Sequence, residues 1–220
     1  LIWFCRRTQI PFKVYAVSDV YGRKGYYDRD EKSETTFEYG EIEYNQFKLL
    51  EFFSSDMTGN EENRMMHYLW MVASRWIYRD WTEKGYPVDI PYKFSLGGTP
   101  LNDAIMAMTT IVPKFKNETG VQKVNTIFLT DGASSRHHFI RDYDMGGDCD
   151  MVDGNDVARR LYGGYKTIVT NPKNGKTYEL TRDLTNDLLR ILKDSVDGMN
   201  LVGFFIAGNG RSGRIDKRTI

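Results

Sequence analysis

The feature that most constrains the fold is the alternation of short, β-rich apolar segments with longer amphipathic segments. Runs of seven or eight residues rich in Val, Ile, Phe and Tyr predict strands, whereas apolar residues that recur every three or four positions predict helices. The predicted strands are residues 12–18, 47–54, 124–130 and 201–207, and the predicted helices are residues 60–80, 100–116 and about 183–196. Strands that alternate with helices predict an α/β fold, in which a doubly wound and mostly parallel sheet is covered on both faces.

The same periodicity predicts which residues face the core. In the first two predicted helices these residues are Met65, Leu69, Val72, Trp76 and Ile77, followed by Leu101, Ala104, Ile105, Met108 and Val112. The strands at residues 124–130 (VNTIFLT) and 201–207 (LVGFFIA) are nearly continuous apolar runs, which predicts that they are buried. Residues 165–180 predict a β-hairpin about Asn174-Gly175, because this pair favours a tight turn.

Length and charge limit the classes of function. A chain of 220 residues suits one domain, here with insertions at about residues 19–46 and 133–181. Lys plus Arg and Asp plus Glu are both 30, so a net charge of zero gives no general attraction to nucleic acid or to an anionic membrane. The apolar runs are far shorter than the roughly 20 residues of a membrane-spanning helix. The two cysteines, Cys5 and Cys149, are too few for a disulfide framework.

Two polar residues are predicted to meet at one edge of the sheet. Thr99 lies on the loop that enters the helix of residues 100–116, and Asp131 follows the strand of residues 124–130. Ligands of open α/β sheets bind beyond the carboxyl ends of the strands, so both residues are candidates for a site. Simpler readings stay open. Thr99 would also suit the N-cap of a helix that Pro100 opens, and Asp131-Gly132 would also suit an ordinary turn.

The motifs around these residues resemble a known family. The segment "GGTPL" at residues 97–101, followed by "IFLTDG" at residues 127–132, is similar to two loops of the von Willebrand factor A domain. That family binds a divalent cation, usually Mg²⁺, at a metal-ion-dependent adhesion site. The resemblance implies that Thr99 and Asp131 are metal-site residues and that Mg²⁺, or another divalent cation such as Mn²⁺, is the cofactor. A partner protein would then complete the site with an acidic side chain, since Mg²⁺ prefers hard oxygen ligands.

One motif of the family does not occur in the sequence. The D-x-S-x-S loop, which follows the family's first and central strand, is found nowhere in the 220 residues. The chain opens with "LIWFCRR", which reads as the end of a helix. We therefore expect a single domain over residues 1–220 that is a fragment of a longer chain, truncated at its first strand. The strands at residues 12–18 and 124–130 would then flank the position of the missing strand.

Within the family, the nearest likeness is to the subunits of the cobalt- and magnesium-chelatase group, relatives of which occur in large tailed phages. Those subunits work beside an AAA+ ATPase in the cytoplasm. The resemblance therefore implies a cytoplasmic protein, in the host cytoplasm if a phage encodes it. The leading hypothesis is a cation-dependent protein-interaction module that is not an enzyme in itself. One alternative is a non-ATPase subunit of a chelatase-like enzyme complex, and another is a degenerate scaffold without metal.

Other polar motifs favour ordinary surface roles. The aspartate-rich segment at residues 141–156 does not match a calcium loop and reads as a solvated loop, with a second cation site or a docking site for a basic partner as the alternative. The segment "NGKT" at residues 174–177 lacks the glycine of a phosphate-binding loop. The adjacent His137 and His138 have no further His or Cys ligand nearby in the sequence, and Cys149 has no histidine pattern for nucleophilic catalysis.

Overall fold

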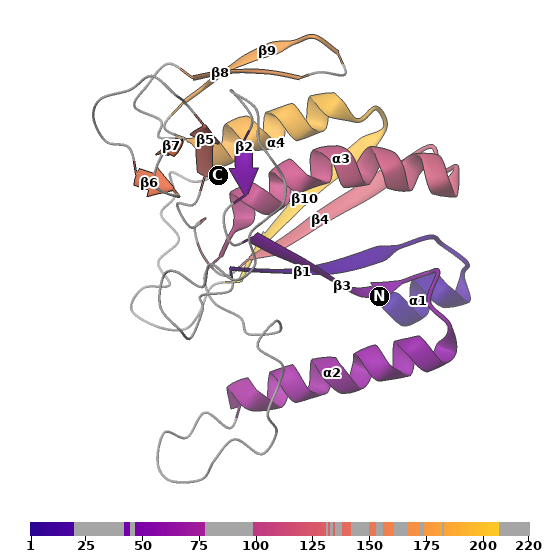
Figure 1. Ribbon diagram of the computed structural model, residues 1–220. Helices are drawn as coiled ribbons and strands as arrows, with labels where there is room; N and C mark the ends of the chain where they lie inside the picture. Colours follow the sequence, from indigo (N-terminus) through magenta and orange to yellow (C-terminus); the bar gives the residue numbers. More distant parts are fainter. Residues whose placement is uncertain are drawn as a thin grey trace, which may run out of the picture. The chain divides into compact units, whose positions relative to one another are not determined.

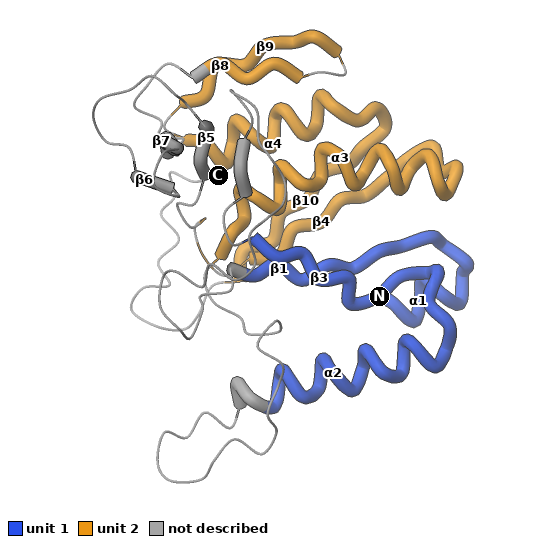
Figure 2. The backbone as a smooth tube through the Cα atoms, viewed as in Figure 1, with its two compact units in different colours: residues 1–31, 46–98 blue, residues 32–45, 99–220 orange. Residues whose placement is uncertain are grey.

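The computed structural model describes the helices, the strands and some of the segments that join them. The described residues are 1–19, 42–44, 47–77, 99–130, 132, 134, 138–141, 150–152, 156–160, 167–171, 174–181 and 183–206. The chain divides into two compact units, coloured in Figure 2, and each is considered by itself. Unit 1 comprises residues 1–31 and 46–98, and unit 2 comprises residues 32–45 and 99–220.

Unit 1 contains helix α1 (Ile2–Arg7), strands β1 (Lys13–Asp19) and β3 (Phe47–Ser54), and helix α2 (Gly59–Ile77) (Figure 1). The two strands are antiparallel, and their register runs from Lys13 opposite Ser54 to Asp19 opposite Phe47. Helix α2 packs on β3. The buried side chains of this unit include Phe52, Phe53 and Val72. The strand and helix predictions for this unit are therefore confirmed, but the α2 face is only partly as expected, because Leu69 is exposed.

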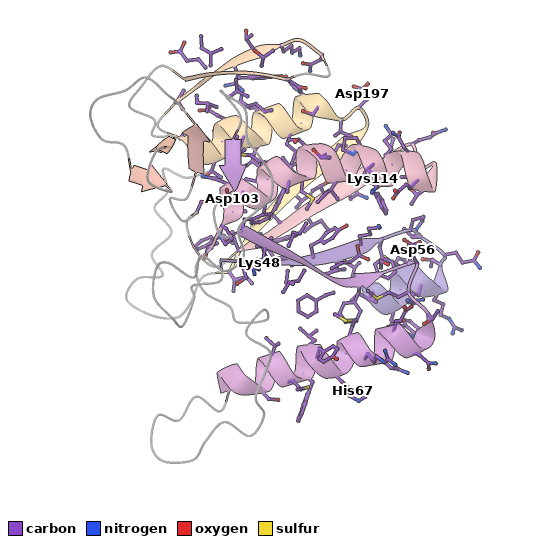
Figure 3. All side chains as sticks on the ribbon, viewed as in Figure 1. Lys48, Asp56, His67, Asp103, Lys114 and Asp197 are labelled. Carbon is purple, nitrogen blue, oxygen red and sulfur yellow. The ribbon has the colours of Figure 1, made fainter. Side chains whose placement is uncertain are left out.

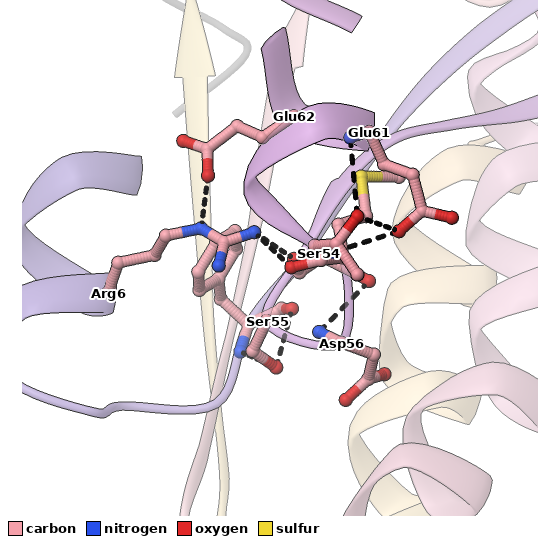
Figure 4. A network of polar contacts seen from close by, with 9 residues as sticks. Arg6, Ser54, Ser55, Asp56, Glu61 and Glu62 are labelled. Atoms are coloured by element: carbon pink, nitrogen blue, oxygen red, sulfur yellow. Dashed lines mark hydrogen bonds and ion pairs between the residues drawn. The ribbon is translucent and has the colours of Figure 1, made fainter. Parts of the chain in front are cut away.

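Helix α2 begins in a polar network that ties it to α1 (Figure 4). The Glu61 carboxylate accepts hydrogen bonds from the backbone nitrogen and the hydroxyl of Thr58, at 2.8 and 2.9 Å. These two hydrogen bonds lower the pKa of Glu61, and the bond from the Thr58 backbone nitrogen has the larger effect. The Arg6 guanidinium donates to the carbonyl oxygens of Ser54 and Met57, at 3.2 and 2.8 Å, and pairs with Glu62. The short α1 is thereby fixed to the end of β3.

Unit 2 is built on helices α3 (Leu101–Thr119) and α4 (Leu184–Ser195) and on strands β4 (Val124–Thr130) and β10 (Met199–Phe205). The two strands are parallel, with Val124 opposite Met199 and Thr130 opposite Phe205. The helices pack on each other, α3 packs on β4, and α4 packs on β10. The buried apolar side chains of this unit include Ala104, Ile105, Met106, Met108, Val112, Val124, Tyr178, Leu180, Leu188, Ile191, Leu192, Val196 and Met199. The predicted core face of α3 is thus confirmed, except that Leu101 is only half-buried.

The prediction that β4 and β10 are buried is wrong for one of their two faces. Side chains alternate between the faces of a strand, and Val124 and Thr126 are buried on the face that α3 and α4 cover. The other face exposes apolar side chains, namely Ile127, Leu129, Val202 and Phe204, of which Leu129 is 69% exposed. The apolar character of these two segments therefore did not indicate burial on both sides of the pair.

The remaining described strands form two further sheets. Strands β8 (Thr167–Thr170) and β9 (Thr177–Leu180) make the predicted hairpin, and Gly175 has a φ of 67°, as a tight turn requires. Strands β2 (Ile42–Tyr44), β5 (His138–Arg141), β6 (Asp150–Val152) and β7 (Asp156–Arg160) form an antiparallel sheet in the order β2-β5-β7-β6. The expectation of a strandless acidic loop at residues 141–156 is therefore wrong at β6 and at the start of β7.

The strand pairing makes the molecule α/β in a looser sense than expected. Among the described strands, only β4 and β10 pair in parallel, and β1 pairs with β3 in the antiparallel sense. The prediction of a mostly parallel sheet thus holds for one pair. Among the described residues, none of the helices has the length and apolar character needed to cross a membrane.

Candidate functional site

The loop that enters α3 carries Thr99, the first of the two predicted metal-site residues. Helix α3 begins at Leu101, so its N-cap position is Pro100, which has no side-chain hydrogen bond to offer. The prediction that Pro100 occupies the first helical position with Thr99 as the N-cap is therefore wrong by one residue. The Thr99 carbonyl accepts a hydrogen bond from the Leu101 nitrogen at 2.8 Å, which closes a γ-turn about Pro100 directly before the helix.

The capping role belongs to a residue from another loop. The backbone nitrogen of Asn102, in the first turn of α3, donates to the Ser134 hydroxyl at 3.0 Å. Ser134 lies 32 positions further along the chain, after the end of β4. The first turn of a helix has backbone N–H groups without partners inside the helix, and a serine hydroxyl is a common acceptor for one of them. This hydrogen bond joins the loop after β4 to the start of α3.

The same two segments meet again at Gly132. A Cβ atom added to Gly132 would lie 3.4 Å from the Thr99 hydroxyl oxygen, so the backbone after β4 approaches the threonine closely. Thr130, the last residue of β4, fixes this turn, because its hydroxyl donates to the Gly132 carbonyl at 2.9 Å and accepts from the Gly132 nitrogen at 3.3 Å. Asp131, the second predicted metal-site residue, lies between these two positions and outside the described residues.

A third segment reaches the same place from α4. The Thr185 hydroxyl, in the first turn of α4, donates to the side-chain oxygen of Asn102 at 2.7 Å. At the sheet, the Ile206 nitrogen donates to the Thr130 carbonyl at 2.8 Å, so β4 and β10 end side by side. The carboxyl edge of the parallel pair is therefore surrounded by the loop after β4 and by the first turns of α3 and α4. This is the position at which open α/β sheets bind their ligands.

Two buried carboxylates lie in the first turns of these helices. Asp103, labelled in Figure 3, is only 1% exposed at the start of α3. Asp187, in the first turn of α4, is also buried, and it accepts hydrogen bonds from the backbone nitrogen and the hydroxyl of Thr181 at 2.5 and 2.8 Å. Within the described part of the chain, no group of three or more His, Cys, Asp or Glu side chains is arranged to hold a metal ion.

The opposite end of α4 carries a second polar cluster. The carboxylate of Asp194 accepts from the Tyr178 hydroxyl at 2.9 Å and from the Lys176 ammonium at 3.3 Å. The hydrogen bond from Tyr178, followed by that from Lys176, lowers the pKa of Asp194. Burial raises the pKa of Tyr178, and the bond to Asp194 acts in the same direction. Asn174, at the hairpin turn, donates to the Asp194 carbonyl at 3.2 Å, so this cluster holds the hairpin on α4.

Sequence reasoning identified one member of the edge and missed three. It placed Thr99 on the loop that enters α3, where the structure has it close to Gly132, but Asn102, Ser134 and Thr185 were not selected. Ser134, two positions after the glycine of T-D-G, was a usable signal, whereas nothing local in the sequence links Thr185 to Asn102, 83 positions away. His137, Cys149 and most of the aspartates of residues 141–156 lie outside the described residues, and the His138 side chain is not described.

Comparisons of the chain with protein-family models, with curated proteins and with solved structures find no match.

Proposed function

We propose that the chain is a divalent-cation-dependent protein-interaction module whose metal site lies at the carboxyl edge of β4 and β10. Thr99 and Asp131 are the ligands in this proposal, and Mg²⁺ or Mn²⁺ is the ion. A partner protein contributes an Asp or Glu side chain, and a AAA+ ATPase is the partner class that the resemblance favours. The fold proposed with it is the doubly wound sheet of the von Willebrand factor A family.

The observation that carries the proposal is the close approach of Gly132 to the Thr99 hydroxyl. Glycine leaves open the space that a Cβ would fill 3.4 Å from this oxygen, so a small ligand of the hydroxyl has room beside it. The Ser134 hydroxyl accepts a hydrogen bond from the Asn102 nitrogen in the first turn of α3, so the loop after β4 is held beside the residue that follows Leu101. A threonine hydroxyl is a hard, uncharged oxygen donor, as Mg²⁺ accepts, and an ion held by few protein anions stays attractive to a carboxylate from outside.

The metal claim is tested by Mn²⁺ binding to the whole protein, measured by calorimetry or by electron paramagnetic resonance. Thr99→Ala is expected to weaken Mn²⁺ affinity by about tenfold or more, since loss even of a group that only orients a ligand costs that much. Thr119→Ala is the matched control, because it removes the same hydroxyl from the other end of α3, where it bonds to the Phe115 carbonyl. Equal affinity of Thr99→Ala and wild-type protein would refute the assignment.

A second pair of variants tests the space beside the hydroxyl. Gly132→Ala places a methyl group against the Thr99 oxygen and is expected to weaken Mn²⁺ binding while the melting temperature changes little. Gly203→Ala, in β10, is the control, because a Cβ there meets nothing within 4 Å. If both variants bind Mn²⁺ as the wild type does, the ion does not sit beside Gly132.

The partner claim is tested by co-purification of the protein from its native cell with Mg²⁺ and with EDTA. A AAA+ ATPase that is retained only with Mg²⁺, and is lost with Thr99→Ala, supports the proposal. An ATPase retained equally in EDTA contradicts a metal–carboxylate contact. The family's D-x-S-x-S loop does not occur in the 220 residues.

A degenerate domain without metal is the second candidate. It is motivated by the sequence, because the 220 residues contain no D-x-S-x-S motif. Wild-type protein that binds neither Mn²⁺ nor Mg²⁺, with its fold intact by circular dichroism, would select this candidate.

A further inference from the structure

The hydrogen bond between Asn102 and Ser134, together with the close approach of Gly132 to Thr99, links the start of α3 to the loop after β4 at two points. The backbone nitrogen of Asn102 donates to the Ser134 hydroxyl at 3.0 Å, and Ser134 lies two residues after Gly132. Gly132 in turn lies against the Thr99 hydroxyl, and Thr99 is three residues before Asn102. The separation of Thr99 from the loop after β4 is therefore set by the bond between Asn102 and Ser134, because the chain between these points is short.

The side chain of Asn102 fixes this link to the rest of the unit. Asn102 is 6% exposed, and its side-chain oxygen accepts the Thr185 hydroxyl at 2.7 Å. Thr185 stands on α4, which packs through Ile191 and Leu192 in the core of unit 2. This bond therefore adds a side-chain contact to the one that the Asn102 backbone makes with Ser134. A buried amide that is hydrogen-bonded on both its backbone and its side chain has one preferred position.

We propose that Asn102 is the positioning residue of the metal site, and that Ser134 and Thr185 act through it to hold Thr99 at ligating distance from the loop after β4. This inference rests on the proposed function, since it assigns a supporting role toward the ion that Thr99 binds. None of the three residues touches the metal. Outer groups that orient metal ligands commonly change affinity by about 10–100-fold when they are removed.

The test compares three hydroxyl deletions in the whole protein. Thr185→Val keeps the side-chain shape and removes the donor to Asn102, and Ser134→Ala removes the acceptor. Ser195→Ala is the matched control, because it removes a half-buried hydroxyl from the other end of α4. That hydroxyl accepts a hydrogen bond from the Asn171 side chain at 2.7 Å and donates one to the Ile191 carbonyl. Mn²⁺ affinity and the metal-free melting temperature are measured for each variant.

Thr185→Val and Ser134→Ala are each expected to weaken Mn²⁺ affinity by about tenfold. The double variant is expected to lose less than the product of the two losses, because both act through Asn102. Thr185→Ser restores the hydroxyl and is expected to restore the affinity. Ser195→Ala is expected to lower the melting temperature without weakening Mn²⁺ binding. Unchanged affinity in Thr185→Val, or an equal loss in Ser195→Ala, overturns the positioning role.

Amide hydrogen exchange without metal separates this inference from the proposed function. Thr185→Val is expected to accelerate exchange of the Asn102 and Gly132 amides, and Ser195→Ala is not. If wild-type protein binds no Mn²⁺, the proposed function fails, and the inference fails with it as a statement about metal. The claim that Asn102 positions the loop after β4 is then tested by hydrogen exchange alone. Unchanged protection of the Gly132 amide in Thr185→Val overturns that claim too.

Discussion

The two ends of α4 both hold another segment through side-chain hydrogen bonds, but they do so by different physics. At the first turn, Thr185 bonds to the buried amide of Asn102, and no charge takes part in that bond. At the last turn, the Asp194 carboxylate accepts a hydrogen bond from the Tyr178 hydroxyl and forms an ion pair with Lys176. This ion pair is largely exposed. A neutral bond that is buried responds weakly to salt and pH, whereas an exposed charged pair responds to both.

This difference shows that one end of α4 fixes the positions of neighbouring segments, whereas the other end only holds a hairpin in place. The end near Thr99 joins three chain segments at the edge of the parallel strands, where small displacements would alter the proposed metal site. The end near Asp194 attaches the β8–β9 hairpin to α4. Buried hydrogen-bonded amides specify position, because leaving one unpaired is costly. Exposed pairs tolerate rearrangement and contribute little.

The largest effect is expected between the two ends, at Leu192, which is fully buried on α4. Leu192→Ala should lower the free energy of unfolding by about 2–5 kcal/mol, because it removes buried methyl groups and leaves a cavity. Chemical denaturation measures the loss, and hydrogen exchange should show both ends of α4 loosening together. Loosening of only one end would show that the helix does not couple the two clusters.

A smaller effect is expected at the buried end. Thr185→Val should lower the free energy of unfolding by about 1–3 kcal/mol, because the side-chain oxygen of Asn102 keeps its burial and loses this donor. The loss in free energy of unfolding should be the same at low and high salt and constant from about pH 5 to about pH 9. Its size should match the contribution of roughly one hydrogen bond under all these conditions. A loss that salt abolishes would contradict the neutral character assigned to this end.

The smallest effect is expected at the exposed end, and it should depend on pH. Because its folded pKa is lowered, Asp194 stabilises the protein above its unfolded pKa of about 3.9, and this contribution disappears as the pH falls through the folded value. Because the pKa of Tyr178 is raised, its contribution is complete below about pH 10 and disappears at higher pH.

Tyr178→Phe tests these two signs together. The variant should be less stable than the wild type near neutral pH, and the difference should shrink in acid and again above about pH 10. Urea denaturation across this range provides the measurement, with Thr185→Val as the pH-independent reference. A difference that stays constant in acid would show that the bond to Asp194 does not depend on the charge of that carboxylate.

Periodicity in the sequence predicted the longer helices and strands of both units, although not β2, β5, β6 and β7. The spacing of Ala104, Ile105 and Met108 predicts α3 and its buried face, since a helix repeats about every 3.6 residues whatever surrounds it. Asn174-Gly175 predicts the hairpin, because few pairs adopt so tight a turn. Thr99 could be assigned to the loop entering α3 for the same local reason, although the position of the cap was wrong by one residue.

Only the tertiary structure decided which faces are covered and which side chains meet. The apolar runs of β4 and β10 predict burial, yet Leu129 and Phe204 are exposed, because burial depends on what packs against a face rather than on its own composition. The bond between Thr185 and Asn102 joins residues 83 positions apart, and no local pattern encodes that distance. Sequence by itself therefore determined the longer helices and strands and the loop of the candidate site, through short-range sterics and periodicity. Packing of α3 against α4 decided the network around Thr99, because contacts between distant segments exist only once the chain has folded.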